Sequence, residues 1–174
     1  MVVQEMTEHE CRTMFAGRRV ARLACAHDNQ PYIVPVHVDV EGDCFYGFAT
    51  LGMKIDWMRG NPRVCLEFDD VTTDGHWLSV VVFGRYEELS ATPEYQEARA
   101  LAERLFQKHP VWWEPASVPL ETHERRLPIV YRIRMGQVTG RRAVPDRPEV
   151  DAVRPSATRP GPLARMLRRF IERK

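Results

Sequence analysis

Short runs of alternating apolar and polar residues, separated by tight turns, most limit how this 174-residue chain can fold. Two of the turns are formed by Asp28-Asn29 and by Glu41-Gly42-Asp43. Strands joined by such short turns favour an antiparallel barrel over a parallel sheet. We therefore expect a mainly β fold, a six-stranded antiparallel barrel with peripheral helices. The predicted strands cover residues 19–26, 30–40, 44–50, 63–69, 76–89 and 127–139.

The predicted strand over residues 30–40 has one apolar face and one mixed face. The apolar face, which we expect to point into the core, consists of Tyr32, Val34, Val36, Val38 and Val40. The other face carries Ile33, Pro35, His37 and Asp39, a mixture that suits neither a core nor open water. Pro35 has no backbone N–H to donate, so it predicts a sheet edge or a bulge. Backbone groups at such a place are free for a ligand.

Lys54 stands where a short helix is expected to begin, between the strands over residues 44–50 and 63–69. The N-terminus of a helix carries about half a positive charge, so a lysine is unfavourable there. A bound anion would remove the conflict, because free backbone amides and the ammonium group together form a phosphate pocket. An exposed lysine at a helix start costs only about 0.3–1 kcal/mol. The pattern alone therefore leaves both interpretations open.

Two further helices are predicted on either side of this region. The first covers residues 7–17 and opens with a capping box formed by Thr7 and Glu10. The second covers residues 92–109, with a threonine cap followed by a proline at its first position. After it come Trp112 and Trp113, which point in opposite directions if the chain is extended. Either both rings are structural, or one of them covers a pocket or a partner.

The chain divides into a domain and an appendage. We expect a domain over residues 1–142, a proline-rich linker over 143–162, and a basic amphipathic helix over 163–174. That helix either docks on its own or a partner subunit, or makes a weak contact with an anionic membrane or nucleic acid. The net charge is +1, and the positive excess lies in this tail, so the domain itself shows no specific nucleic-acid footprint.

Several function classes are disfavoured by what the sequence lacks. No apolar run approaches the roughly 20 residues that span a bilayer, and the acidic start is not a signal peptide. The cysteines Cys11, Cys25, Cys44 and Cys65 show neither a CxxC pair nor metal-ligand spacing. We interpret them as small buried residues in a reducing cytoplasm, with no metal site. The chain has no catalytic triad, Walker loop or Rossmann loop, which disfavours hydrolysis, phosphoryl transfer and nicotinamide binding by the usual fold.

The order of the motifs resembles a known family. A capped helix precedes GRRVARLACAHDNQPYIVPVHV, then CFYGFATLGMKIDWMRGNPRVCLEF, HWLSVVVFGRYEEL and VYRIRMGQVTGR. The most specific part is the succession of Lys54, Asn61-Pro62-Arg63-Val64 and the segment 79–84. Over residues 7–142 the chain resembles the FMN-binding split-barrel superfamily of pyridoxamine 5′-phosphate oxidase-like proteins. Within it, the branch that includes the nitroimidazole-resistance proteins is the most similar.

The resemblance implies a six-stranded split barrel that forms a homodimer, with one FMN in each of two grooves between the subunits. It also implies roles for individual residues. Lys54 would hold the FMN phosphate, with Phe48, Ala49 and Thr50 beside the ribityl chain and phosphate. Val34, Pro35, Val36 and His37 would line the isoalloxazine ring. Trp77 and Ser79 would present a polar position to the cofactor.

Two departures from the family pattern limit this assignment. Many relatives carry a second basic residue just before the lysine, where this chain has Met53. The final segment RIRMGQVTGRR does not match the arginine-rich signature with which the true oxidase grips pyridoxal phosphate. The sequence therefore argues against oxidation of pyridoxamine phosphate.

The leading hypothesis is an FMN-dependent oxidoreductase that passes electrons between a reduced donor and a small-molecule substrate, with the chemistry carried by the cofactor. His37 titrates near neutral pH and is the candidate catalytic group, although a histidine bonded to neighbouring backbone fits the sequence equally well. A second class is a non-catalytic protein that holds haem, deazaflavin or flavin for storage or sensing. A third is a structural dimer whose groove has lost its ligand.

Overall fold

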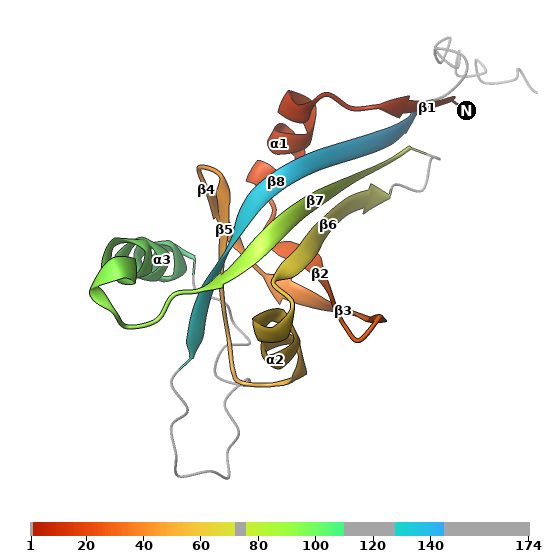
Figure 1. Cartoon of the computed structure of the whole chain (residues 1–174). Coiled ribbons are helices and arrows are strands. Elements are labelled where there is room, and N and C mark those ends of the chain that lie inside the picture. The colour runs from red at the N-terminus through yellow and green to blue at the C-terminus, as the bar shows by residue number, and fades with distance from the viewer. Residues whose placement is uncertain (1, 72–75, 110–127, 145–174) are drawn as a thin grey trace, which may run out of the picture. The chain divides into compact units, whose positions relative to one another are not determined.

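A curled antiparallel sheet forms the body of the protein in the computed structural model, which describes residues 2–71, 76–109 and 128–144 (Figure 1). The strand order is β3-β2-β6-β7-β8-β5-β4, with β1 added to β8. The strands are β1 (Val2–Glu5), β2 (Val20–His27), β3 (Gln30–His37), β4 (Asp39–Glu41), β5 (Cys44–Ala49), β6 (Arg63–Val71), β7 (Trp77–Glu88) and β8 (Ile129–Val144). All of their pairings are antiparallel. The prediction of a mainly β, antiparallel fold is confirmed.

The described residues form eight strands rather than six, for two local reasons. The strand expected over residues 30–40 is divided at Val38, whose amide donates to the Arg19 carbonyl at 2.9 Å. Consequently β3 pairs with β2, whereas β4 pairs with β5 at the opposite end of the sheet. The second addition is β1, whose four residues are all exposed and therefore lack the alternation that marks a strand. It pairs with β8, which continues beyond the predicted residue 139 to Val144.

One face of the curled sheet carries the main core. Its centre is formed by Phe15, Phe45 and Phe68, whose ring centroids lie 5.2–5.5 Å apart. Two helices cover this face: α1 (Glu8–Ala16) contributes Phe15, and α2 (Met53–Gly60) contributes Ile55 and Met58, all of them buried. The predicted capping box is present on α1 and the helix ends at Gly17 as expected. Burial of these apolar side chains is what attaches both helices to the sheet.

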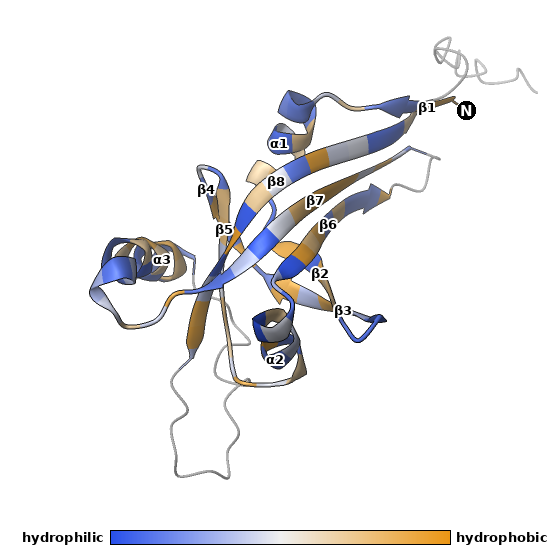
Figure 2. Ribbon diagram, in the orientation of Figure 1, coloured by the Kyte–Doolittle hydropathy of each residue, from blue (hydrophilic) through white to orange (hydrophobic). Residues whose placement is uncertain are grey.

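The hairpin between β2 and β3 turns on two residues. Asp28 and Asn29 have φ values of 48° and 61°, as a two-residue type I′ turn requires, and both side chains tolerate this conformation. The turn is the hydrophilic end of the hairpin (Figure 2). Its geometry sets the register that pairs Arg22 with Pro35 and Cys25 with Tyr32. The predicted turn is therefore confirmed.

A second, smaller core attaches α3 (Gln96–Lys108) to β5 and β8. Tyr46, Leu89, Ala102 and Val130 are buried in it, and Ala98, Leu101, Leu105 and Phe106 of α3 pack around them. A short 3₁₀ turn, η1 (Pro93–Tyr95), precedes the helix where one continuous helix was expected, and Thr92 makes no side-chain cap there. Tyr46 follows Phe45 on β5, so the two cores occupy opposite faces of the sheet.

The residues up to Val144 form one compact unit. The predicted proline-rich linker, the predicted C-terminal helix and the pair Trp112-Trp113 lie outside the described residues, so these three interpretations remain predictions. Among the helices that the structure describes, none has the length and apolar character needed to cross a membrane.

Candidate functional site

The start of α2 is a helix end without a side-chain cap. Its N-cap is Gly52, which offers only a carbonyl, and that carbonyl accepts from the amides of Ile55 and Asp56 at 2.9 and 3.1 Å. By contrast, α1 is capped from both sides by Thr7 and Glu10. The first amides of α2 therefore have the positive character of a helix N-terminus and no side-chain cap, and Asp56 is the acidic residue of this first turn.

Lys54 lies in this first turn of α2 and is half-buried. Burial raises the pKa of the Cys25 thiol on β2, and the charge of Lys54 opposes that rise, so the ammonium acts on the β2 side of the helix. No carboxylate within residues 2–71, 76–109 and 128–144 forms an ion pair with Lys54. The nearby Asp56 lies 3.9 Å from Arg59 instead. A cation and uncapped amides thus occupy the same helix end.

Edge strand β3 carries the residues predicted to line a ring. The strand pairs only with β2, which confirms that Pro35 lies at a sheet edge. Pro35 is exposed and His37 is half-buried on the outer face, whereas Val34 and Val36 point toward the main core. Only the backbone of these two valines can therefore meet a ligand on the outer face.

Ser79 and Trp77 lie on the same outer face as Pro35, but farther across the sheet. Cross-strand partners run from Pro35 through Arg22 and Glu67 to Val81, two residues from Ser79. Two strands separate β3 from β7, so three spacings of about 4.8 Å place Val81 roughly 14 Å from Pro35, and Ser79 lies two residues farther along β7. The Ser79 hydroxyl donates to Glu67 Oε1 at 3.2 Å. Within one chain, Trp77 and Ser79 are not brought together with Pro35.

The three residues predicted at the end of β5 separate as well. Ala49 is buried, and the ring of Phe48 packs edge-on against Phe106 of α3, with centroids 5.0 Å apart. Phe48 therefore faces the smaller core. Thr50 is half-buried in the short link between β5 and α2, four residues before Lys54. Of the three, Thr50 and the backbone of Ala49 lie closest to the start of α2 along the chain.

The model of the pyridoxamine 5′-phosphate oxidase family matches residues 7–142. The chain belongs to this family. A Rhizobium meliloti (strain 1021) protein, RA0666, is 42% identical over 146 residues, which cover 82% of this chain and 97% of the relative. The family assignment made from the motif order is confirmed.

Solved structures agree with membership of the pyridoxamine 5′-phosphate oxidase family. A FAD-binding protein from Mesorhizobium loti is 38% identical, covers 83% of this chain and 100% of its own, and superposes with a TM-score of 0.68. A protein assigned to 5-nitroimidazole antibiotic resistance, from Bacteroides thetaiotaomicron, is 18% identical with a TM-score of 0.57, over 82% of this chain and 89% of its own. The second likeness concerns the fold alone.

One feature of the outer face was missed by sequence reasoning. Ile33, Ala24, Cys65 and Phe83 are partners in register across β3, β2, β6 and β7, and form an apolar row on the outer face. Ile33 and Phe83 remain 59% and 49% exposed. Beside this apolar row, Arg22 pairs with Glu67 and Asp69. The signal was present as alternation in each strand, but only the strand order shows that the four side chains adjoin.

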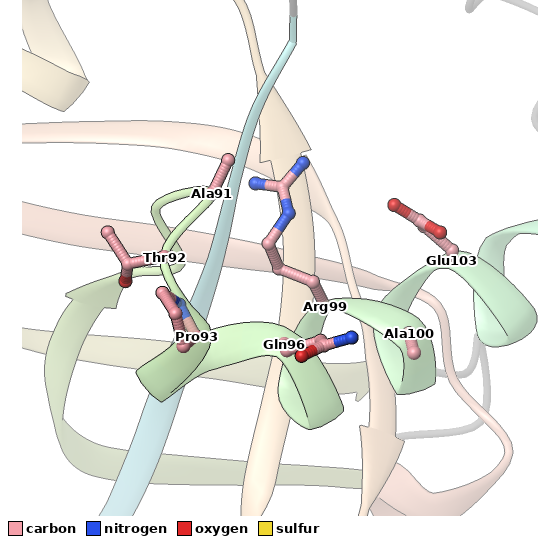
Figure 3. A pocket seen from close by; sticks show the side chains of 7 residues that line it. All are labelled: Ala91, Thr92, Pro93, Gln96, Arg99, Ala100 and Glu103. Carbon is pink, nitrogen blue, oxygen red and sulfur yellow. The ribbon is translucent and has the colours of Figure 1, made fainter.

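A surface pocket of about 440 Å³ at the start of α3 lies apart from the predicted residues (Figure 3). It is lined by Ala91, Thr92, Pro93, Gln96, Arg99, Ala100 and Glu103. The Arg99 guanidinium, which would be its natural anion ligand, already donates to the Leu89 carbonyl at 2.5 Å. None of the predicted site residues lines this pocket.

Asp39 on β4, expected on the mixed face of its strand, is buried. Its Oδ1 lies 2.9 Å from His109 Nδ1 at the C-terminal end of α3. Because a buried carboxylate requires a partner, this contact explains both the burial and the position of the helix end. Asp39 thus serves the attachment of α3 and is not a ligand candidate.

Proposed function

We propose that this protein binds a flavin whose FMN portion directs its phosphate to the start of α2. The observation that carries the proposal is the half-buried Lys54 in a helix turn without a side-chain cap. A phosphate accepts from backbone amides and from an ammonium at once, and so satisfies both. The 38% identical FAD-binding protein from Mesorhizobium loti supports a flavin as the bound molecule.

The remaining predicted residues fit the other parts of the molecule. Thr50 and the backbone of Ala49 follow the ribityl chain toward Lys54. The exposed edge of β3, at Pro35 and His37, gives the isoalloxazine ring a surface with free backbone groups. When bound, a flavin supplies electron and hydride transfer. The chain's own contribution is to bind and orient it, and His37 holds or donates a proton beside the ring.

We propose that the site is completed by a second copy of the chain. The apolar row of Ile33, Ala24, Cys65 and Phe83 gives the outer face a surface that a homodimer would bury. A two-fold interface pairs this patch with itself. It would also supply the missing wall of the groove, because Ser79 lies more than about 14 Å from Pro35 within one chain. The predicted grooves between subunits rest on this argument.

The proposed activity is oxidoreduction of a small molecule in the cytoplasm. All four cysteines are free, as suits a reducing compartment. A protein that only holds the cofactor would share the same binding geometry. Turnover distinguishes the oxidoreductase from the protein that only holds the cofactor. In an oxidoreductase, adding the substrate speeds the re-oxidation of the reduced flavin.

The binding proposal is tested by titrating flavin into the purified apoprotein and its variants. Lys54→Ala is expected to weaken FMN binding about ten- to a hundredfold, since a charged hydrogen bond contributes about 1.5–3 kcal/mol. Lys108→Ala, an exposed lysine at the other end of a helix, is the matched control and should bind as the parent does. Equal affinity of the Lys54 variant and the parent would contradict the proposal, as would a parent that binds no flavin.

A further inference from the structure

We infer that the bound flavin is the dinucleotide FAD, whose adenosine lies against His27 in the pocket at the β2–β3 turn. The inference rests on the flavin proposal and adds a second subsite to it. Three features of the described residues carry it. The first is an aromatic run, the contacting side chains of Trp57, Tyr32 and His27 beside α2. The second is the length of α2 from Lys54 to the pocket, and the third is the polar lining of that pocket.

The aromatic run begins one helical turn after Lys54, at Trp57. The centroid of its ring lies 5.6 Å from that of Tyr32 in an edge-on contact. It lies 5.8 Å from that of His27, with the two ring planes inclined by only 30°. Trp57 therefore supports the imidazole from one side, while the His27 side chain remains 47% exposed. A supported, exposed aromatic ring is a platform on which a nucleobase stacks.

The distance along α2 from the proposed phosphate site at Lys54 to the pocket suits half of a dinucleotide. Lys54 acts on Cys25, and Gly60 lies beside His27, so α2 advances along β2 from the first pair to the second. Six residues of helix rise about 9 Å. That length is comparable to the adenosine monophosphate half of FAD, counted from its own phosphate, which a bridging oxygen joins to the FMN phosphate. FMN alone would end at Lys54 and leave the platform unused.

The pocket at the far end has a volume of about 420 Å³ and a polar lining. It is formed by Ala26, His27, Asp28, Asn29, Gly60 and Asn61. Asn61 fixes one wall, because its side chain donates to the Ala26 carbonyl at 3.1 Å and accepts from the Arg63 amide at 3.3 Å. The Asp28 carboxylate is 90% exposed and is the acceptor that ribose hydroxyls require.

The experiment compares FAD with FMN on the same full-length apoprotein by calorimetric titration. The parent should bind FAD about tenfold more tightly than FMN, the contribution expected of one stacked base. His27→Ala should reduce that ratio to near one while the FMN affinity stays unchanged. Asp28→Asn, which tolerates the same positive φ, should lower the ratio in the same direction. His9→Ala, an exposed histidine on α1, is the matched control and should keep the parent ratio.

The outcomes separate the two proposals. Equal affinities for FAD and FMN in the parent would overturn the inference and leave the flavin proposal standing. So would a His27→Ala variant that loses both affinities alike, because a disturbed fold or phosphate site would affect both ligands. A parent that binds neither flavin would remove the flavin proposal and this inference together.

Discussion

At the residue scale, a small residue in a strand indicates that another side chain packs closely against it, but the sequence does not show which one. Gly47 and Ala49 are the smallest residues of β5, which indicates that a group packs closely on their face. The structure identifies that group for Gly47, where an added Cβ would lie 2.6 Å from the ring of Tyr131. The sequence indicated the contact but not the partner, since Tyr131 comes from a strand more than eighty residues later.

This close approach gives a stability prediction. Gly47→Ala should lower the free energy of unfolding by about 1–3 kcal/mol, because the fully buried Tyr131 ring has no room to move. Urea unfolding followed by circular dichroism measures the change. Gly17→Ala is the control, since Gly17 has a negative φ and nothing within 4 Å of an added Cβ, and its stability should match the parent. An unchanged midpoint for the Gly47 variant would show that the ring yields.

At the element scale, strand positions were predictable and strand limits were not. Alternation located β2, β3, β5, β6, β7 and β8, because each of them has one buried face. The division at Val38 could not be read from the same pattern, since alternation continues through it. It depends on the Arg19 carbonyl, which only the folded hairpin brings within 2.9 Å. Similarly, the uncapped start of α2 was visible as Gly52, whereas the supporting contacts of Trp57 with β2 and β3 were not.

The pairing of β7 with β8 predicts a pH dependence of stability. Burial of Glu87 would by itself raise its pKa, but hydrogen bonds from Arg132 and Arg134 lower it below the usual value of 4.5. A carboxylate whose pKa is lower in the folded protein stabilises the fold above its unfolded pKa and loses that contribution as pH falls through the folded value. Stability should therefore decline below about pH 4.5, and Glu87→Gln should decline less.

Urea midpoints at pH 7 and pH 3.5 measure this difference between the parent and the Glu87 variant. Glu94→Gln, an exposed carboxylate on η1, serves as the control and should follow the parent at both values. The same slope for the Glu87 variant and the parent would refute the linkage between this cluster and acid stability.

At the scale of the whole molecule, the sequence was sufficient for the family and for the antiparallel sheet, and it grouped the site only in part. Lys54 and Thr50 are close in sequence, so local patterns brought them together. Ser79 and Pro35 were joined by resemblance, and the distance across two intervening strands is a property of strand order that no local pattern contains. The proposed dimer would resolve this distance, which makes the oligomeric state the decisive property at this scale.

If the proposed dimer forms, a charge in the apolar row should both separate the subunits and weaken flavin binding. The parent should elute and scatter light at about twice its chain mass of 20.2 kDa. Phe83→Asp places a carboxylate at the β7 end of the apolar row, and the Phe83 side chain is 49% exposed, so the fold should survive the change. Light scattering should then give one chain mass, and FMN affinity should fall at least tenfold because each groove loses a wall.

Val3→Asp, a change at a 51% exposed residue on β1, is the control and should remain dimeric and bind as the parent does. A monomeric Phe83 variant with full FMN affinity would show that one chain holds the cofactor unaided, and a dimeric one would move the interface to another face.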